Sequence, residues 1–194
     1  MKLFERLPDG VTVDGKHYKL NFDFRNVLKM LEVLAMEGLM DDARDYLALK
    51  CLTRRPRNVE KVLKAVRDTL SLFPDTHQRG EKITSFEQDA GLIRTAFRQE
   101  YGIDLFRDHL HWLEFTELLQ NLPGGNRYEE VLGIRARPLP SATQYNQKER
   151  EWLINAKRQC ALHLTEQEAA KKYERDVVNV FAGIMAIMPK EDVR

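Results

Sequence analysis

The sequence predicts a mainly α fold, a helical domain with a small N-terminal β-hairpin. Apolar residues recur three and four positions apart over most of the chain, which is the spacing of one face of an α-helix. Two capping boxes mark helix starts, and an Asp-Gly dipeptide at Asp14 stands between two short alternating segments. A chain of 194 residues with 43% hydrophobic content is long enough to bury one core.

The first third of the chain predicts a hairpin and then three helices. In VTVDGKHYKL, the Asp-Gly dipeptide accepts the positive φ angles of a two-residue turn. The apolar stripe from Phe24 predicts a helix that Gly38 ends. Asp41 is expected to cap the second helix and Asn58 the third. The apolar residues expected on the second helix are Ala43, Tyr46, Leu47 and Cys51.

The stretch SFEQDAGLIRTAFRQEYGIDL, residues 85–105, predicts a helix with signals at both ends. Ser85, or the threonine before it, is expected to cap its start, with a glutamate or glutamine two or three residues on as the other half of a capping box. Gly102 fits the left-handed position that ends such a helix. Asp104 is expected to cap the next helix, which runs through five leucines to the turn LPGG.

The last third is less regular. RYEEVLG predicts a short helix, the prolines of IRARPLPSATQYN predict an extended arm or an ordered loop, and KEREWLINAKRQCAL predicts an amphipathic helix. A second capping box, Thr165 with Glu168, opens a final helix that becomes strongly apolar. We therefore expect a helical domain over residues 1–163 and a C-terminal apolar helix within residues 164–194, packed on the domain or used for association.

Composition argues against several classes of function. The 31 basic and 30 acidic residues leave a formal charge of +1, which gives no global attraction to nucleic acid or anionic membranes. The N-terminal MKLFERLPDG lacks the apolar stretch of a secretory signal, and the longest apolar run, Val177–Met188, is shorter than the ~20 residues that span a bilayer. Cys51 and Cys160 lack CxxC spacing and are expected to be unpaired, buried thiols.

The acids and histidines after residue 105 give little support to a catalytic or metal site. His109 and His111 are two positions apart and would diverge by about 200° on the predicted helix, so they cannot chelate one ion. Asp108, His111 and a nearby glutamate could share a face, but such sets are common on charged helices. No glycine-rich phosphate loop or nucleophile elbow is present. We expect no metal, no cofactor and no enzymatic activity.

One acidic residue of the 85–105 stretch is not expected at the surface. Asp89 lies on the apolar stripe of its predicted helix and is expected to be at least partly buried. A buried carboxylate needs a hydrogen-bond partner, because desolvating it alone costs several kcal/mol. The candidates are the Trp112 indole, His111 or an arginine of IRARPL. We interpret Asp89, His111 and Trp112 as a polar pin between helices, with a functional role for Asp89 as the alternative.

Two further segments are candidate binding surfaces. LTRRPRN holds three arginines at a helix junction, and a solvated turn is favoured over a nucleic-acid site because no wider basic face accompanies it. The final helix is apolar around nearly its whole circumference and must be buried on more than one side. Its apolar residues either pack in the core or bind a partner: Val177, Val178, Phe181, Ile184, Met185 and Met188.

Four segments resemble those of a known protein family and follow one another in the same order as in that family: LPDGVTVDGKHYKLNFDFRNVLKMLEVL, SFEQDAGLIRTAFRQEYGIDL, HLHWLEFTELLQNLP, and the region from LGIRARPL to KEREWLINAKRQCAL. Together they resemble the bacteriophage gene-product-fifteen family, small tail-module proteins of siphophages and prophages of Gram-positive bacteria. They cover most of residues 7–162, and FEQDAGLIRTAFRQEYGIDL with the following LHW is the most specific part. Residues 39–82 match only in helical character, and the helix after Thr165 does not map onto the family.

The resemblance implies a protein without an established active site, encoded near the tape-measure gene and acting in the host bacterial cytoplasm during phage assembly. We expect a tail assembly chaperone or assembly factor that covers apolar faces of the helical tape-measure protein by helix-in-groove binding. The alternative is a structural tail or neck component retained in the virion. Self-association into a homo-oligomer is left open, and neither nucleic acid nor membrane is expected as a partner.

Overall fold

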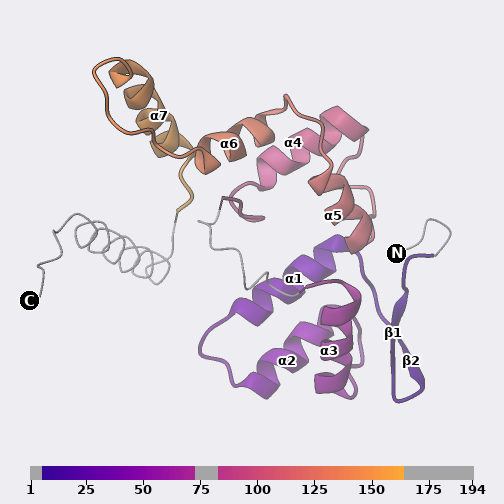
Figure 1. Ribbon diagram of the computed structural model, residues 1–194. Coiled ribbons are helices and arrows are strands. Elements are labelled where there is room, and N and C mark those ends of the chain that lie inside the picture. The colour runs from indigo at the N-terminus through magenta and orange to yellow at the C-terminus, as the bar shows by residue number, and fades with distance from the viewer. Residues whose placement is uncertain (1–5, 73–82, 164–194) are drawn as a thin grey trace, which may run out of the picture. The chain divides into compact units, whose positions relative to one another are not determined.

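The computed structural model describes residues 6–72 and 83–163. The chain divides into two compact units, each described here by itself: residues 1–82 with 89–131, and residues 83–88 with 132–194. The described residues form seven α-helices and one two-stranded antiparallel sheet (Figure 1). The predicted mainly α fold with a small N-terminal hairpin is therefore confirmed. The boundary expected at residue 164 coincides with the end of the described part and stays a prediction.

The hairpin joins β1 (Gly10–Val13) to β2 (Lys16–Lys19). The strands are antiparallel, with Val11 opposite Tyr18. Both turn residues have positive φ angles, 50° at Asp14 and 74° at the glycine that follows, as the Asp-Gly dipeptide predicts. The two valines of β1 are buried, so one side of the hairpin belongs to the core of its unit.

Three helices follow the hairpin: α1 (Phe24–Ala35), α2 (Asp41–Lys50) and α3 (Val59–Thr69). α1 packs on α2, α2 on α3, and α3 on β1. α1 ends three residues before Gly38, which has a φ angle of 81° in the connection to α2. Met40, not Asp41, is the N-cap of α2, and Asp41 lies just inside the helix, where a carboxylate favours the helix dipole. Asn58 is the N-cap of α3, although its side chain makes no capping bond.

α4 (Ala90–Tyr101) begins later than the sequence predicts. Ser85 does not cap this helix, so that prediction is wrong. Its hydroxyl accepts a hydrogen bond from the backbone N–H of Gln88 at 3.3 Å, within a turn that precedes the helix. The chain passes from one compact unit to the other between Gln88 and Asp89.

α4 ends at the glycine where the sequence predicts its end. Gly102 has a φ angle of 68°, and its backbone N–H donates to the carbonyl of Phe97. Gly102→Ala is expected to lower the free energy of unfolding by about 1 to 2 kcal/mol, because an L-residue is strained in this conformation. Gly124 is the control. A Cβ added at either glycine would have no neighbouring atom within 4 Å, but Gly124 lacks a positive φ angle. Urea denaturation should therefore show the loss for Gly102→Ala and little change for Gly124→Ala; equal effects would contradict the backbone explanation.

α5 (Trp112–Gln120) also begins later than predicted. Asp104 does not cap a helix, so that prediction is wrong. Its carboxylate accepts a hydrogen bond from the backbone N–H of Phe106 at 3.0 Å, in a short turn. The N-cap of α5 is His111, which the sequence had placed in the middle of a helix.

Tertiary pairing explains why residues 108–111 are not helical. The backbone N–H of Phe24 donates to the carbonyl of Leu110 at 3.0 Å, and the N–H of Trp112 donates to the carbonyl of Phe22 at 2.8 Å. These bonds form an isolated antiparallel bridge just before α1. A backbone N–H donates one hydrogen bond, and the N–H of Trp112 is used in the bridge. It therefore cannot bond to a carbonyl in a preceding helical turn, so the helix begins only after the bridge.

The core of this unit is centred on Phe115 of α5. Its ring stacks on Phe24 of α1, with ring centroids 4.6 Å apart, and on Phe97 of α4 at 5.3 Å. Trp112 lies 5.9 Å away on the same helix. All four rings are buried, so α1 shares one aromatic cluster with α4 and α5, which are consecutive helices far from α1 in the sequence.

The other unit contains the end of α6 (Arg127–Ala136) and all of α7 (Gln147–Cys160). α6 is three residues longer than the helix predicted in RYEEVLG, so the predicted arm begins as helix. Within this unit Arg135 donates to the carbonyl of Cys160 at 2.5 Å and to the carbonyl of Ile83 at 2.9 Å. Arg135 thereby joins the end of α7 to the segment before α4.

Candidate functional site

The start of α1 forms a charged cluster with the segment that precedes α5. Asp23 is the N-cap of α1, and its carboxylate accepts the backbone N–H of Arg25 at 3.0 Å. The Arg25 guanidinium returns to the same carboxylate at 3.2 Å. It also donates to the carbonyls of Leu105 and Asp108, each at 2.8 Å. One arginine therefore ties residues 105–108 to the beginning of α1.

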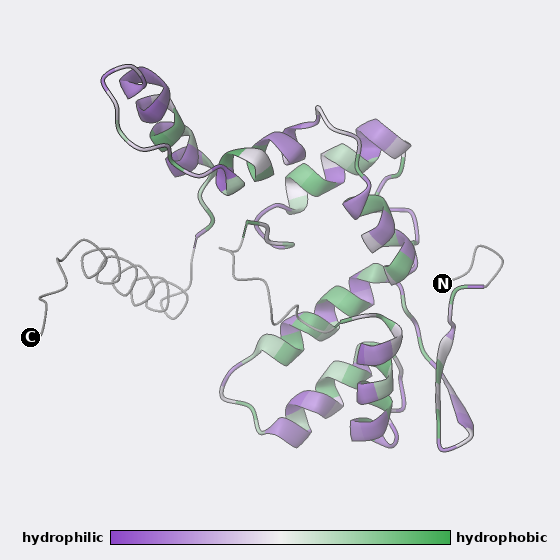
Figure 2. Cartoon of the chain, viewed as in Figure 1, coloured by the Kyte–Doolittle hydropathy of each residue, from purple (hydrophilic) through white to green (hydrophobic). Residues whose placement is uncertain are grey.

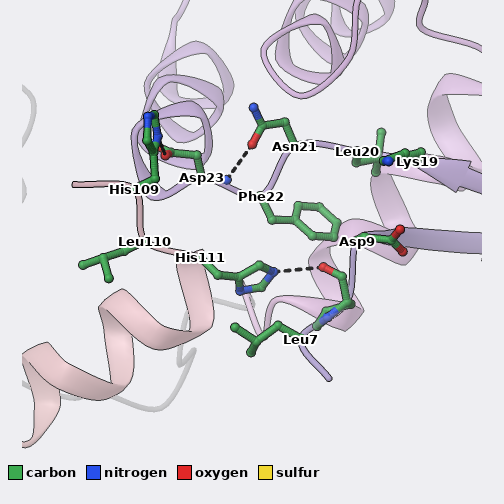
Figure 3. Close-up of a pocket in the computed structure, with 11 residues that line it drawn as sticks. Leu7, Asp9, Lys19, Leu20, Asn21, Phe22, Asp23, His109, Leu110 and His111 are labelled. Carbon is green, nitrogen blue, oxygen red and sulfur yellow. Dashed lines mark hydrogen bonds and ion pairs between the residues drawn. The ribbon is translucent and has the colours of Figure 1, made fainter. Parts of the chain in front are cut away.

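His109 completes the cluster on the solvent side. Its Nδ1 lies 2.8 Å from a carboxylate oxygen of Asp23 (Figure 3). The imidazole is 87% exposed, whereas the Asp23 side chain is only 11% exposed. Burial raises the pKa of Asp23, but the hydrogen bonds from His109 and Arg25 and the charge of Arg25 outweigh this effect and lower the pKa below its ordinary value of 3.8. Asp23 therefore remains an ionised cap at neutral pH.

His111 connects the chain before the hairpin with the start of α5. Its Nδ1 accepts the backbone N–H of Leu113 at 3.1 Å, and its Nε2 lies 3.0 Å from the carbonyl oxygen of Pro8 (Figure 3). Because Nδ1 accepts a hydrogen bond, the ring proton is placed on Nε2, which donates to Pro8. Phe22 packs edge-on against the imidazole, with ring centroids 5.6 Å apart. Both ring nitrogens are thus engaged with backbone groups.

Acid is expected to weaken the fold through His111. Burial lowers the pKa of His111, and the smaller opposing effect of the Pro8 carbonyl does not cancel it. The unfolded chain therefore binds the proton more readily, so the free energy of unfolding is fully retained above the ordinary pKa of 6.5 and falls as the pH drops below it. Urea denaturation at about pH 7.5 and about pH 5 should show a smaller loss for His111→Asn, which keeps a capping oxygen, than for the wild type. The same loss in both proteins would contradict this role.

These groups line an open hollow of about 600 Å³, formed by residues 7–9, 19–23 and 109–111 (Figure 3). A carboxylate that orients a histidine occurs in general-base sites. However, the residues that line this hollow include no serine, threonine or cysteine to serve as a nucleophile. Asp23 is also occupied as a helix cap and as the partner of Arg25. We therefore assign the pair of Asp23 and His109 to holding the chain segments together.

The two histidines diverge for a reason that differs from the predicted one. Neither lies within a helix, so the helical angle of about 200° does not apply, and each histidine is held by a different part of the chain. His109 points to Asp23 and His111 to Pro8. Within residues 6–72 and 83–163, no group of three His, Cys, Asp or Glu side chains lies close enough to hold a metal ion. That the protein needs no metal or cofactor remains an expectation.

The predicted burial of Asp89 is confirmed, since this residue is only 1% exposed. Asp89 is the N-cap residue of α4, but its side chain makes no capping hydrogen bond there. In the described part of the chain, every buried side-chain nitrogen or oxygen has a hydrogen-bond partner, so the carboxylate is not left unsatisfied. Trp112 is buried as well. The ring nitrogens of His111 bond to Pro8 and Leu113, and a pin that joins Asp89 to His111 and Trp112 stays a prediction.

The remaining predicted sites have mixed outcomes. Thr165 and the six apolar candidates within Val177–Met188 lie outside the described residues. The three arginines of LTRRPRN are exposed, as expected, in the irregular segment between α2 and α3, whereas its leucine is buried. Cys51 and Cys160 are free, as predicted, but half-buried instead of buried. No helix among the described residues is long and apolar enough to cross a membrane.

Sequence reasoning missed an apolar surface at α2. Tyr46 and Leu47 are among the apolar residues expected on this helix, but the residues it buries are Ala48 and Leu49. An apolar connection from α1 runs into the charged first turn of α2 (Figure 2). Met40, at the junction, is 78% exposed. We call the following exposed residues the α2 surface: Met36, Leu39, Met40, Tyr46 and Leu47.

The second unit also exposes large apolar side chains. Leu139 and Tyr145 lie on the segment between α6 and α7, and Trp152 lies on α7 itself. These positions fall in and just after IRARPLPSATQYN, which the sequence predicted as an arm or ordered loop. Trp and Tyr are the residues most enriched at the energetic centres of protein interfaces, so this segment is a second surface suited to binding.

Comparison with known proteins identifies the family. The family model described as Bacteriophage Gp15 protein matches residues 3–162, which run from before the hairpin to beyond the end of α7. No curated protein and no solved structure matches the chain. The match covers well over half of the 194 residues, and it confirms the resemblance carried by the four segments. The chain belongs to the Bacteriophage Gp15 protein family.

Proposed function

We propose that this phage protein is a non-catalytic assembly factor of the tail module that acts as a tail assembly chaperone on the tape-measure protein, in the host bacterial cytoplasm. Family membership is the observation that carries the proposal. The α2 surface supports it, because a group of exposed apolar side chains is typical of protein-binding sites. The carboxylate of Asp23 already caps α1 and pairs with Arg25, which favours a structural role for the Asp23 cluster over a catalytic one.

The proposed action is to cover apolar faces of a long helical client until tail-tube subunits replace the chaperone. Two of the five residues of the α2 surface are methionines, whose flexible side chains adapt to varied partners. A client helix would bind by its apolar face, as amphipathic helices bind in grooves. Such binding needs no active site, no metal and no nucleic-acid contact.

Mass spectrometry of purified virions tests this function. A chaperone that leaves after assembly should be absent from virions but abundant in the infected-cell lysate. Tail-tube and tape-measure peptides from the same sample serve as the positive control. Recovery of the protein at a fixed ratio to tail-tube subunits would instead support a structural tail or neck component, and would contradict the chaperone proposal.

A further inference from the structure

The arginines of LTRRPRN lie beside a basic strand of the hairpin. Between them is a hollow of about 210 Å³, formed by residues 16–20, by two apolar side chains of α2 and α3, and by the segment that joins these helices. Lys16 and Lys19 of β2 line it together with Arg55 and Arg57. We call it the β2 hollow. The sequence showed no wider basic face next to LTRRPRN, and the fold supplies one.

The four cations that line the β2 hollow have no acidic counterpart in it. No Asp or Glu is among the residues that line it, and in the described part of the chain no acid forms an ion pair with any of the four. Asp9 pairs with His17 at 3.3 Å, and Asp14 pairs with Lys61 at 2.7 Å. Glu60, in the first turn of α3, does not line the hollow. The hollow is therefore positively charged, although the net charge of the chain is only +1.

The β2 hollow follows the free edge of β2. All of residues 16–20 line it, and successive side chains of a strand point to opposite faces, so the hollow runs along the edge and not over one face. The backbone N–H of Leu20 donates to the carbonyl of Asp9 at 2.9 Å. Because alternate residues of an antiparallel pair bond to the partner strand, His17 and Lys19 direct their N–H and C=O groups away from β1.

The next outward position on this edge is already paired with another segment. The backbone N–H of Asn21 donates to the carbonyl of Leu52 at 3.0 Å. Two and four residues earlier, the backbone N–H groups of Lys19 and His17 have no acceptor among the described residues. A strand edge with such unpaired groups is a template for a further strand, so the edge of β2 is open where the four cations lie.

The shape and charge of the β2 hollow argue against three kinds of occupant. Pockets for small molecules are larger, roughly 300 to 1,000 Å³. Nucleic acids need a wider basic face or free aromatic rings, but Tyr18 is the only Phe, Tyr or Trp that lines the hollow, and the ammonium of Lys16 lies 5.6 Å from its ring centroid. A second copy of the chain would bring two lysine-bearing edges together, and like charges on paired strands repel.

We propose that the β2 hollow binds an extended acidic segment of another protein. The segment pairs with the outward backbone groups of His17 and Lys19 as an added strand, and its Asp or Glu side chains lie beside Arg55 and Arg57. Main-chain pairing provides the extended conformation of the ligand, and the cations select its charge. This inference goes beyond the proposed function, which concerns apolar faces of a helical client.

Three labelled peptides test the proposal on the full chain. The first has about eight residues of alternating glutamate and threonine, so that the acids share one face of a strand. The second carries lysine in place of glutamate. The third has the first sequence with methyl groups on its central backbone nitrogens, which keeps the charge and removes the N–H donors. Fluorescence anisotropy should give a Kd at least about tenfold lower for the glutamate peptide than for the other two, and added salt should weaken its binding.

Charge-reversal variants locate the binding. Lys19→Glu and Arg55→Glu, both at exposed positions, should each weaken binding of the glutamate peptide several-fold and strengthen binding of the lysine peptide. Loss of folding cannot imitate that exchange of preference. Lys148→Glu, at an exposed position in α7 of the other unit, makes the same change in net charge and is the matched control, which should bind as the wild type does.

Four results would overturn the inference. Equal binding of the glutamate and lysine peptides, or equal effects of Arg55→Glu and Lys148→Glu, would show that the four cations do not select the ligand. Equal binding of the methylated peptide would exclude strand pairing. Tighter binding of a short single-stranded DNA of the same charge would make nucleic acid the occupant. Self-association of the wild type that the glutamate peptide disrupts would make a second copy the occupant.

Discussion

Phe115→Ala is expected to lower the free energy of unfolding by about 3 to 5 kcal/mol. The ring of Phe115 is almost fully buried and stacks on Phe24 and Phe97, so its removal leaves a cavity between α1, α4 and α5. The neighbouring rings lie on two other helices, α1 and α4, and a shift of one helix cannot fill the space left against the other. Urea denaturation, extrapolated linearly to water, measures the loss.

Phe106→Ala is the control for this change. The Phe106 ring is 71% exposed, and its contact is with the guanidinium of Arg94, 4.1 Å from the ring centroid. Removing it should cost about 1 kcal/mol or less, as for an exposed cation–π pair. If Phe115→Ala cost no more than Phe106→Ala, the aromatic cluster would not be the centre of the core.

Arg25→Leu is expected to lower the free energy of unfolding by about 2 to 4 kcal/mol. Leucine keeps an apolar stem but removes the donors to the carbonyls of Leu105 and Asp108 and the ion pair with Asp23. Hydrogen bonds to charged groups contribute about 1.5 to 3 kcal/mol each, and partly buried carbonyls left without donors add to the loss. Urea denaturation again gives the value.

The control is Arg67→Leu. Arg67 lies 3.9 Å from Asp45, and both side chains are partly exposed. Such surface pairs contribute about 0 to 1 kcal/mol. Similar losses for Arg25→Leu and Arg67→Leu would mean that residues 105–108 are held in place by something other than the guanidinium of Arg25.

Features set by a few neighbouring residues could be predicted from the sequence. The hairpin turn depends on the positive φ angles that Asp14 and the following glycine adopt. The end of α4 depends on the left-handed conformation of Gly102. In both cases the dihedral preference of one or two residues determines the structure, and no distant contact is required.

Helix starts that depend on distant contacts could not be predicted. Asp104 has the right chemistry for an N-cap, and its carboxylate does accept a backbone N–H. α5 nevertheless begins at Trp112, because Leu110 and Trp112 pair with the backbone just before α1. Ser85 likewise accepts a backbone N–H, but within a turn that precedes α4. Local capping rules do not distinguish the start of such a turn from the start of a helix.

The candidate sites show the same limit. The burial of Asp89 followed from its place on an apolar stripe. The meeting of His109 with Asp23 and Arg25 could not be predicted, because His109 lies more than eighty positions after both in the chain and reaches them only through the fold. The α2 surface was missed because the helix has apolar residues on two sides, and the sequence did not show which side is buried.

Co-purification with the tape-measure protein tests the central claim most directly. Overlapping segments of the tape-measure protein from the same phage, each fused to an affinity tag, are co-expressed with the full chain. Tail-tube subunits, tagged in the same way, are the control. We predict that tape-measure segments with an apolar helical face retain the protein through washing and that tail-tube subunits do not. If no tape-measure segment retains it, while the protein is folded by circular dichroism, the chaperone account is wrong.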